Sequence, residues 1–269
     1  MTVTVDERRL IMAALDREAT ADLNALWTKA EELASGDFAA YMIDAFPDLA
    51  TEYAALAAEM AAAWYAESPS TTTFVPVPGP LPVVEALTTS AEWALGGTGL
   101  IGLDRLQGTL QRSTWNAARQ TIFDNVDAEG ARWARHARAD ACAFCALMAS
   151  RGAVYTSEAA AERVVGRGKE MSLADRRARA AGHSRVNGHT AAGGKRTRGT
   201  QALGDRYHDF CNCVAVEVRP GEEYDPPDYV RKWDEAYIVA SRETKKKGRY
   251  GAIDPKAVLA HMRENLGAR

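Results

Sequence analysis

The first half of the chain repeats apolar residues at three- and four-residue intervals, the spacing of amphipathic helices. Residues 7–35 show this pattern, and residues 47–67 repeat it among alanines of high helix propensity. Pro47 is expected to open the second helix, because proline and the acidic Asp48 and Glu52 suit a first turn. Further helices are predicted for residues 83–95 and 101–126.

In the second half the spacing of apolar residues becomes shorter than the helical period in two places. Residues 131–138 alternate loosely, and residues 213–218 form the clearest strand, ended by Arg219-Pro220-Gly221. Two more helices are predicted after Pro226-Pro227 and after Asp254-Pro255. The predicted fold is therefore mainly α, with a helical N-terminal region and a small α+β module built on a short β-sheet.

Composition changes along the chain suggest its domain organisation. Residues 68–82 hold closely spaced prolines, which forbid a helix and favour an extended, stiff connector. The predicted parts are an acidic helical region at 1–67, a Pro-rich linker at 68–82, a helical connector at 83–126, a Cys/His module at 127–220 with a basic flexible loop at 182–204, and a C-terminal helical tail at 221–269.

All four cysteines lie in two short segments, a C-x-x-C at 142–145 and an H-x-x-C-x-C at 208–213. Zn²⁺ takes four such nitrogen and sulfur ligands in a tetrahedron. The candidate ligands are Cys142, Cys145, His208, Cys211 and Cys213. Five candidates for four places leave open which of Cys211 and Cys213 completes the set. A closed site of this kind is structural, so we expect a zinc clamp on the module and no hydrolytic chemistry.

Other interpretations of the cysteines are possible from the sequence. Four cysteines allow three disulfide pairings, but disulfides need an oxidising compartment, and the N-terminus lacks the layout of a secretory signal. A thioredoxin-like redox pair needs a βαβ unit, which the pattern does not predict. Ordinary buried thiols are the remaining alternative. We expect synthesis in the cytoplasm, and no membrane span because the sequence has no apolar run of sufficient length.

The net charge of −3 hides a division of the chain into two parts of opposite sign. Residues 1–100 hold 15 acidic and 4 basic side chains, whereas the remainder holds 21 acidic and 29 basic ones. The basic loop at 182–204 has two interpretations: it contacts nucleic acid, or it is a solvated insertion. The candidate nucleic-acid-binding residues lie in or beside the basic loop: Arg176, Arg177, Arg179, Arg185, Lys195, Arg196 and Arg198.

The run from Cys142 to Tyr155, closed by His208-x-x-Cys211-x-Cys213 and Pro220, resembles the MuF-like minor head proteins of tailed bacteriophages, in a version common in phages of actinobacteria. The match spans residues 133–220. It implies a low-copy protein inside the phage head that associates with the portal and acts in head assembly and in DNA packaging or ejection. It implies no catalytic residues. The chain departs from the commoner pattern at Asp209 and Asn212, which leaves ligation possible.

Two functions of different classes follow. The first is a structural assembly protein of the virion, whose acidic helices dock on the portal, major capsid or scaffold protein while its basic part faces packaged DNA. The second is a capsid maturation protease, which needs a nucleophile beside a base. The nearest candidates are Ser184 next to His183, with Ser150, His136 and His189 as others. No G-x-S-x-G turn surrounds any of these serines, so the sequence favours the first function.

Overall fold

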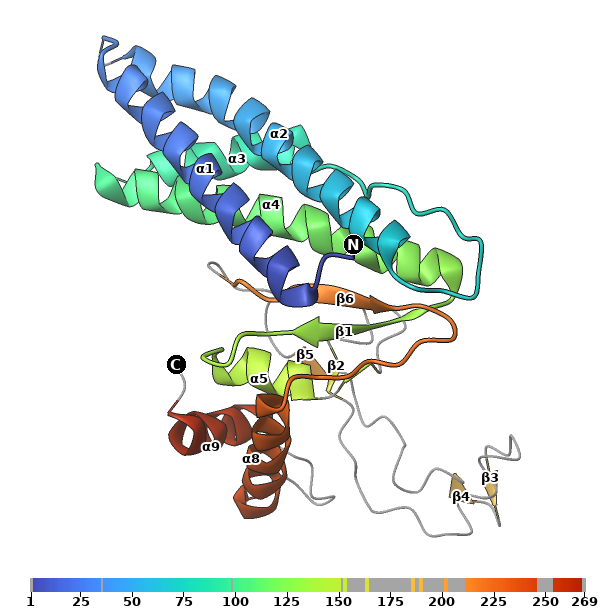
Figure 1. Cartoon of the computed structure of the whole chain (residues 1–269). Coiled ribbons are helices and arrows are strands. Elements are labelled where there is room, and N and C mark those ends of the chain that lie inside the picture. The colour runs from blue at the N-terminus through green and yellow to red at the C-terminus, as the bar shows by residue number, and fades with distance from the viewer. Residues whose placement is uncertain are drawn as a thin grey trace. The chain divides into compact units, whose positions relative to one another are not determined.

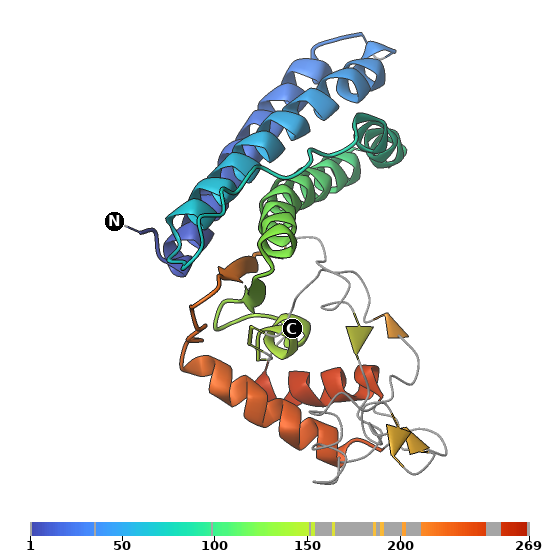
Figure 2. The same cartoon turned by 90° about the vertical axis from the view of Figure 1, so that its right-hand side faces the viewer.

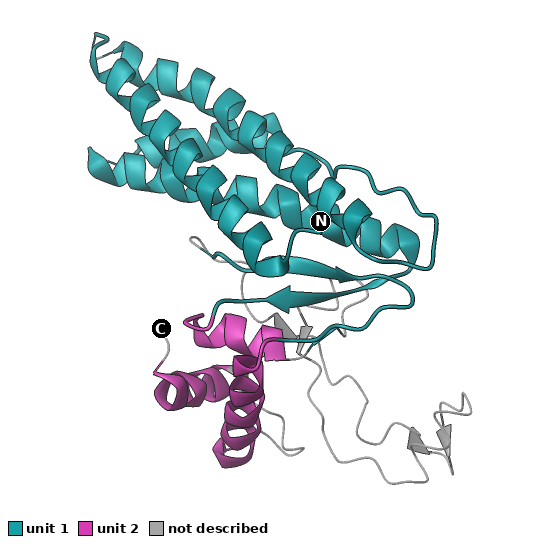
Figure 3. Cartoon of the chain, viewed as in Figure 1, with its two compact units in different colours: residues 1–138, 152–157, 207–226 teal, residues 139–151, 158–206, 227–269 magenta. Residues whose placement is uncertain are grey.

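The structure is a computed structural model that describes residues 2–34, 36–97, 99–150, 152–153, 163–164, 185–186, 189–190, 201–202, 211–245 and 254–267. The chain divides into two compact units (Figure 3). The first comprises residues 1–138, 152–157 and 207–226, and the second comprises residues 139–151, 158–206 and 227–269. The described part is mainly helical with a small antiparallel sheet, which confirms the predicted fold class.

Four helices make up most of the first unit: α1 (Val5–Glu31), α2 (Asp37–Glu67), α3 (Val84–Leu95) and α4 (Leu100–Glu129) (Figure 1). Helix α2 packs against each of the other three. Their apolar faces enclose one core, because each amphipathic helix must cover its apolar stripe. Its larger buried members are Leu23, Trp27, Met42, Phe46, Tyr53, Leu87, Leu106 and Leu110.

The ends of the long helices follow local sequence signals. Thr4 caps α1 in a capping box: its hydroxyl accepts from the Glu7 amide, and the Glu7 carboxylate accepts from the Thr4 amide at 2.8 Å. Gly130 ends α4 in a left-handed conformation with φ of +72°. Its amide returns to the carbonyl of Asp127, and the chain leaves directly into a strand.

The prediction that Pro47 opens the second helix is wrong, because Pro47 lies inside α2. A proline in a helix interior costs roughly 3 kcal/mol, since it removes a hydrogen bond and its ring crowds the preceding turn. Met42 and Phe46 precede it and are fully buried in the core. Burial of each such side chain contributes about 1.5–3 kcal/mol, which offsets the proline and extends the helix back to Asp37.

The sheet of the first unit pairs β1 (Arg132–His136) with β6 (Val214–Val218), and both strands lie where the sequence predicted one. The strands run antiparallel, with Arg132 opposite Val218 and His136 opposite Val214. All five residues of β6 are buried. Both strands pack against α4, and β6 also packs against α1. Two further pairs of two residues each join β2 (Arg163–Val164) to β5 (Gln201–Ala202) and β3 (Arg185–Val186) to β4 (His189–Thr190).

The Pro-rich segment is extended, as expected, and it is bound along α4. The Asn125 side chain accepts from the Val77 amide at 2.9 Å and donates to the Val77 carbonyl at 2.7 Å. The Gly79 amide donates to the Thr121 hydroxyl at 2.9 Å. A Cβ at Gly79 would lie 3.0 Å from the Thr121 amide nitrogen, a tight contact that would push the segment away from α4.

The second unit contains α5 (Ala143–Ser150), α8 (Tyr229–Glu243) and α9 (Pro255–Leu266). These three helices pack on one another around Leu147, Ala240, Val258 and Met262. Asp254 caps α9, whose first residue is a proline, by accepting from the Lys256 amide at 3.2 Å. No helix in the described part of the chain is long and apolar enough to cross a membrane.

Two buried ion pairs tie the sheet of the first unit to its helices. Arg219 follows β6 and bonds Glu129, at the end of α4, at 2.9 Å. The same guanidinium donates to the backbone carbonyls of Tyr65, Ser68 and Phe74. One arginine therefore joins the strand end, the end of α2, the Pro-rich segment and α4.

The second pair joins Arg8 of α1 to Glu217 of β6 at 2.8 Å, and both side chains are almost fully buried. Arg8 also donates to the hydroxyl of Ser68 and to the carbonyl of Trp64, while Ser68 donates to Glu217. Breaking a buried pair by removing one partner leaves an uncompensated charge, so these contacts strongly fix the position of β6.

The Glu129–Arg219 pair predicts that the free energy of unfolding decreases in acid. Burial alone would raise the pKa of Glu129, but bonds from Arg219, Thr72 and Tyr65 outweigh it and lower the pKa to about 2. A lowered folded-state pKa gives stability that is present above pH 4.5 and lost as the pH falls towards 2. The loss is on the order of 3 kcal/mol at most.

Urea unfolding at pH 7 and pH 3 tests this. The difference in free energy of unfolding between wild type and Glu129→Gln should be smaller at the lower pH. The exposed Glu59→Gln is the control; an unchanged difference would contradict the assignment.

Candidate metal centre

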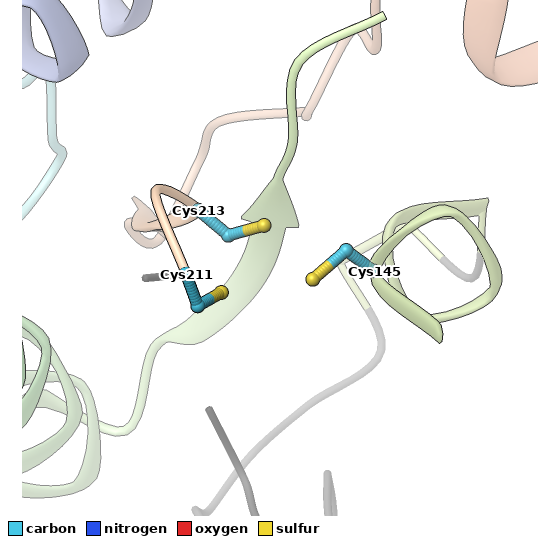
Figure 4. Close-up of side chains that lie close together, drawn as sticks. All are labelled: Cys145, Cys211 and Cys213. Carbon is cyan, nitrogen blue, oxygen red and sulfur yellow. The ribbon is translucent and has the colours of Figure 1, made fainter. Parts of the chain in front are cut away.

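Three cysteines come together in the structure: Cys145, Cys211 and Cys213. All three are buried, and their sulfur atoms lie within 4.8 Å of one another. Figure 4 shows the three thiols pointing toward one another. All four cysteines of the chain lie in described segments, and none forms a disulfide.

Cys145 is placed by the first turn of α5. The carbonyl of Cys142 accepts from the Ala146 amide at 2.9 Å, so the helix starts directly after Cys142. The C-x-x-C spacing thus puts one cysteine just before the helix and the other inside its first turn.

Cys211 and Cys213 are held by Arg119, a buried residue of α4. Its guanidinium donates to the Cys211 carbonyl at 2.6 Å and to the Cys213 carbonyl at 2.8 and 3.0 Å. A third partner is the side chain of Asn116, at 2.9 Å. These charge-assisted bonds satisfy buried carbonyls that would otherwise cost about 1–3 kcal/mol each. Arg119 therefore fixes the backbone that carries both thiols.

A second contact from α4 fixes the residue between the two cysteines. Gln111 donates to the side-chain oxygen of Asn212 at 3.0 Å. Asn212 is only half-buried, whereas Cys211 and Cys213 on either side of it are buried. Residues two apart in an extended segment point to the same face, so this arrangement turns both sulfur atoms to one side. Both cysteines lie immediately before β6 in the chain.

The donor set fits a thiophilic metal ion. Zinc–sulfur bonds of about 2.3 Å in a tetrahedron place neighbouring sulfur atoms about 3.8 Å apart, which is compatible with the observed limit. Buried thiolates also need a counter-charge, because a buried anion without one is costly. The three cysteines can therefore hold a metal ion, and a fourth ligand would close the site.

The other predicted ligands are Cys142 and His208. Cys142 is half-buried and is not in the group of three. His208 lies outside the described residues, so its part in the site stays a prediction. The structure brings both cysteines of the C-x-C segment to Cys145, where the sequence left a choice between them.

The basic candidates Arg176, Arg177, Arg179, Lys195, Arg196 and Arg198 lie outside the described residues. Of Arg185 only the backbone is described, in β3. Nucleic-acid contact by this group therefore stays a prediction.

Two of the protease candidates have described side chains, and both are bonded elsewhere. Ser150 donates to the carbonyl of Leu147 within α5 at 3.0 Å. His136 lies 3.3 Å from Asp6. Burial lowers the pKa of His136, although Asp6 opposes this shift. His183, Ser184 and the side chain of His189 lie outside the described part.

Sequence reasoning missed the residues that position the cysteines, above all Arg119 and Gln111. One signal was present in the sequence. Arg119 falls on the same helical face as the buried Trp115 and Ile122, and a charged residue within an apolar stripe needs a partner. The partner itself is 92 and 94 residues away along the chain, which no local pattern indicates.

A family model, described as VG15 protein, matches residues 2–240 of the chain. The chain belongs to the VG15 family. This family is phage-associated, so this member is a phage protein. The match includes α1 through most of α8, and with them all three clustered cysteines and the helix that positions two of them. No curated protein and no solved structure matches the chain.

The cysteine group predicts about one metal ion per chain in freshly prepared, reduced protein. Cys145→Ser and Cys213→Ser should each lose the ion, because a serine hydroxyl does not replace a thiolate ligand. Ser150→Ala, a change in the same helix as Cys145, should keep it. Elemental analysis with circular dichroism as a folding check measures this. Reduced wild type without metal, or Cys145→Ser with wild-type content, would contradict the assignment.

Proposed function

We propose that this VG15 family member is a minor head protein of a tailed phage, associated with the portal and acting in head assembly and in DNA packaging or ejection. The family match over residues 2–240 carries the proposal, because it places the chain among phage-associated proteins. The likeness of residues 133–220 to MuF-like head proteins supplies the specific role. On this proposal the protein is made in the host cytoplasm and ends inside the head.

The division of charge supports two different neighbours. An acidic helical part suits docking on a protein of the head, whereas a basic part suits packaged DNA, because Lys and Arg neutralise phosphates without reading sequence. The helices α1 to α4, with their common core, provide a rigid body for the protein contact. The portal and the major capsid or scaffold protein are the proposed protein partners.

We further propose that the metal is zinc and that its role is structural. Zinc prefers thiolate and imidazole ligands in a tetrahedron. Cys145, Cys211 and Cys213 would hold it, and Cys142 or His208 would supply the fourth ligand. When bound, zinc would supply a fixed positive charge that holds its ligands together. The chain's own part is to present two thiols on the Arg119-bound backbone and a third from a helix start.

The proposed role predicts that the protein is a low-copy component of DNA-filled particles. Quantitative mass spectrometry of purified virions should detect it at a small fraction of the major capsid protein, since portal-associated proteins are few per head. A replication protein of the same phage serves as the negative control. Absence from particles would contradict the proposal. Cleavage of the major capsid protein by the purified protein would support the protease instead.

The basic loop predicts weak, sequence-independent binding to duplex DNA that falls with salt. The log–log slope should be roughly −3 to −5 if about four to six charges engage phosphates. Replacing Lys195, Arg196 and Arg198 by alanine should reduce the slope by about 2–3 and leave metal content unchanged. The matched control replaces Arg231, Lys232 and Arg242, exposed cations of α8. An equal reduction of the salt slope in both triple variants, or no DNA binding by wild type at low salt, would contradict DNA contact through the loop.

A further inference from the structure

Three large apolar side chains are exposed together at the turn between α3 and α4. Trp93 is 60% exposed near the end of α3, and Leu100 and Ile101 are 79% and 55% exposed at the start of α4. Single exposed apolar residues are normal on a soluble protein, but several large ones exposed at one turn are typical of an interaction site. We call Trp93, Leu100 and Ile101 the apolar tip.

Contacts around Gly97 link Ile101 to Trp93 through Arg105. A Cβ at Gly97 would lie 3.1 Å from the Ile101 side chain and 3.0 Å from the guanidinium of Arg105. That guanidinium lies over the Trp93 ring, 4.4 Å from its centroid, and donates to the Trp93 carbonyl at 3.2 Å. Ile101 and the Arg105 guanidinium therefore both lie beside Gly97, and the same guanidinium lies over the Trp93 indole and holds it in place.

The apolar tip is rigidly supported from below. Gly102 packs beneath it, where a Cβ would lie 3.3 Å from the Trp27 ring of α1. Trp27 in turn stacks edge-on against Phe38 of α2 at 4.8 Å. The turn between α1 and α2 lies at this same end of the helices, away from β1 and β6 (Figures 1 and 2).

The charge around the apolar tip is negative. Five exposed acidic residues lie at this end of the first unit: Glu31, Glu32, Asp37, Glu92 and Asp104. The two cations there are Lys29 and Arg105, and each lies over an aromatic ring, Tyr41 and Trp93 respectively. The surface thus offers an apolar centre with an acidic border, which is the usual plan of a protein interface.

We propose that the apolar tip docks a basic, partly apolar surface of another protein of the particle. This inference rests on the proposed function and names the surface through which the acidic helices act. Positive charge on the partner complements the acidic border, and apolar side chains on it would cover Trp93, Leu100 and Ile101. A nucleic acid or an anionic membrane is repelled by the same border. Two copies meeting tip to tip would oppose like charges, which disfavours self-association.

The test measures binding of the purified full chain to each other structural protein of the particle, prepared singly and immobilised. Wild type should bind one of them, more weakly as salt is raised, because exposed charges are screened. The double variant Leu100→Ser, Ile101→Ser should weaken binding by about tenfold or more, since centrally placed apolar residues dominate interfaces. Glu92→Lys with Asp104→Lys should also weaken it. Val75→Ser with Val77→Ser, at sites 77% and 62% exposed on the Pro-rich segment, should leave it unchanged.

The outcomes separate this inference from the proposed function. If wild type binds a head protein and the Leu100, Ile101 double variant binds it equally well, the apolar tip is not the docking surface, although the head role stands. If no head protein binds wild type, the inference is wrong. The head role is then decided separately by whether mass spectrometry detects the protein in purified virions. Sedimentation in which wild type is a dimer and the double variant a monomer would assign the surface to a second copy and overturn the proposed partner.

Discussion

Buried guanidinium groups fix the strand β6 and the segment before it to the helices of the first unit. Arg119 binds the backbone of Cys211 and Cys213, Arg8 pairs with Glu217 inside the strand, and Arg219 pairs with Glu129 just beyond it. A two-stranded sheet is marginally stable by itself. These contacts replace the support that further strands would give, and they make the position of β6 depend on α1, α2 and α4 together.

This dependence explains how a helical protein presents a thiol site. The cysteines of the C-x-C segment are short side chains, so their sulfur positions follow the backbone closely. Arg119 fixes that backbone through its carbonyls, and Gln111 fixes Asn212 between the two cysteines. A site whose ligands are held before the metal arrives loses less entropy on binding. Rigid presentation of this kind suits a structural role better than one that requires ligand exchange.

The charge division assigns the two proposed contacts to different parts of the sequence. The acidic part contains the long helices and their core, which resist deformation because several apolar faces meet in one packed interior. The apolar tip at one end of these helices is the kind of surface that needs such rigid support. The basic part carries the cations proposed to meet DNA, a contact that requires little fixed geometry. The two proposed contacts, one with a protein and one with DNA, are therefore assigned to different parts of one chain.

Much of the secondary structure was determined by the sequence alone. Periodicity predicted α3, α4, both strands of the main sheet and the last two helices, since apolar spacing reflects the face that each element buries. The cysteine spacing gave five candidate ligands, and the structure brings three of them together, Cys145, Cys211 and Cys213. Pro47 was misplaced because its local preference lost to burial of Met42 and Phe46.

Only the tertiary structure decided which long-range partners meet. Arg119 binds Cys211 and Cys213, and Arg219 binds Glu129, each across about ninety residues of sequence. No periodic pattern in the sequence indicates such pairs. The same is true of Asn125, which binds the Pro-rich segment along α4. Local patterns record which face of an element is buried. The partner of a buried polar group is set by how the elements pack, because desolvation demands a partner but does not specify where in the chain it lies.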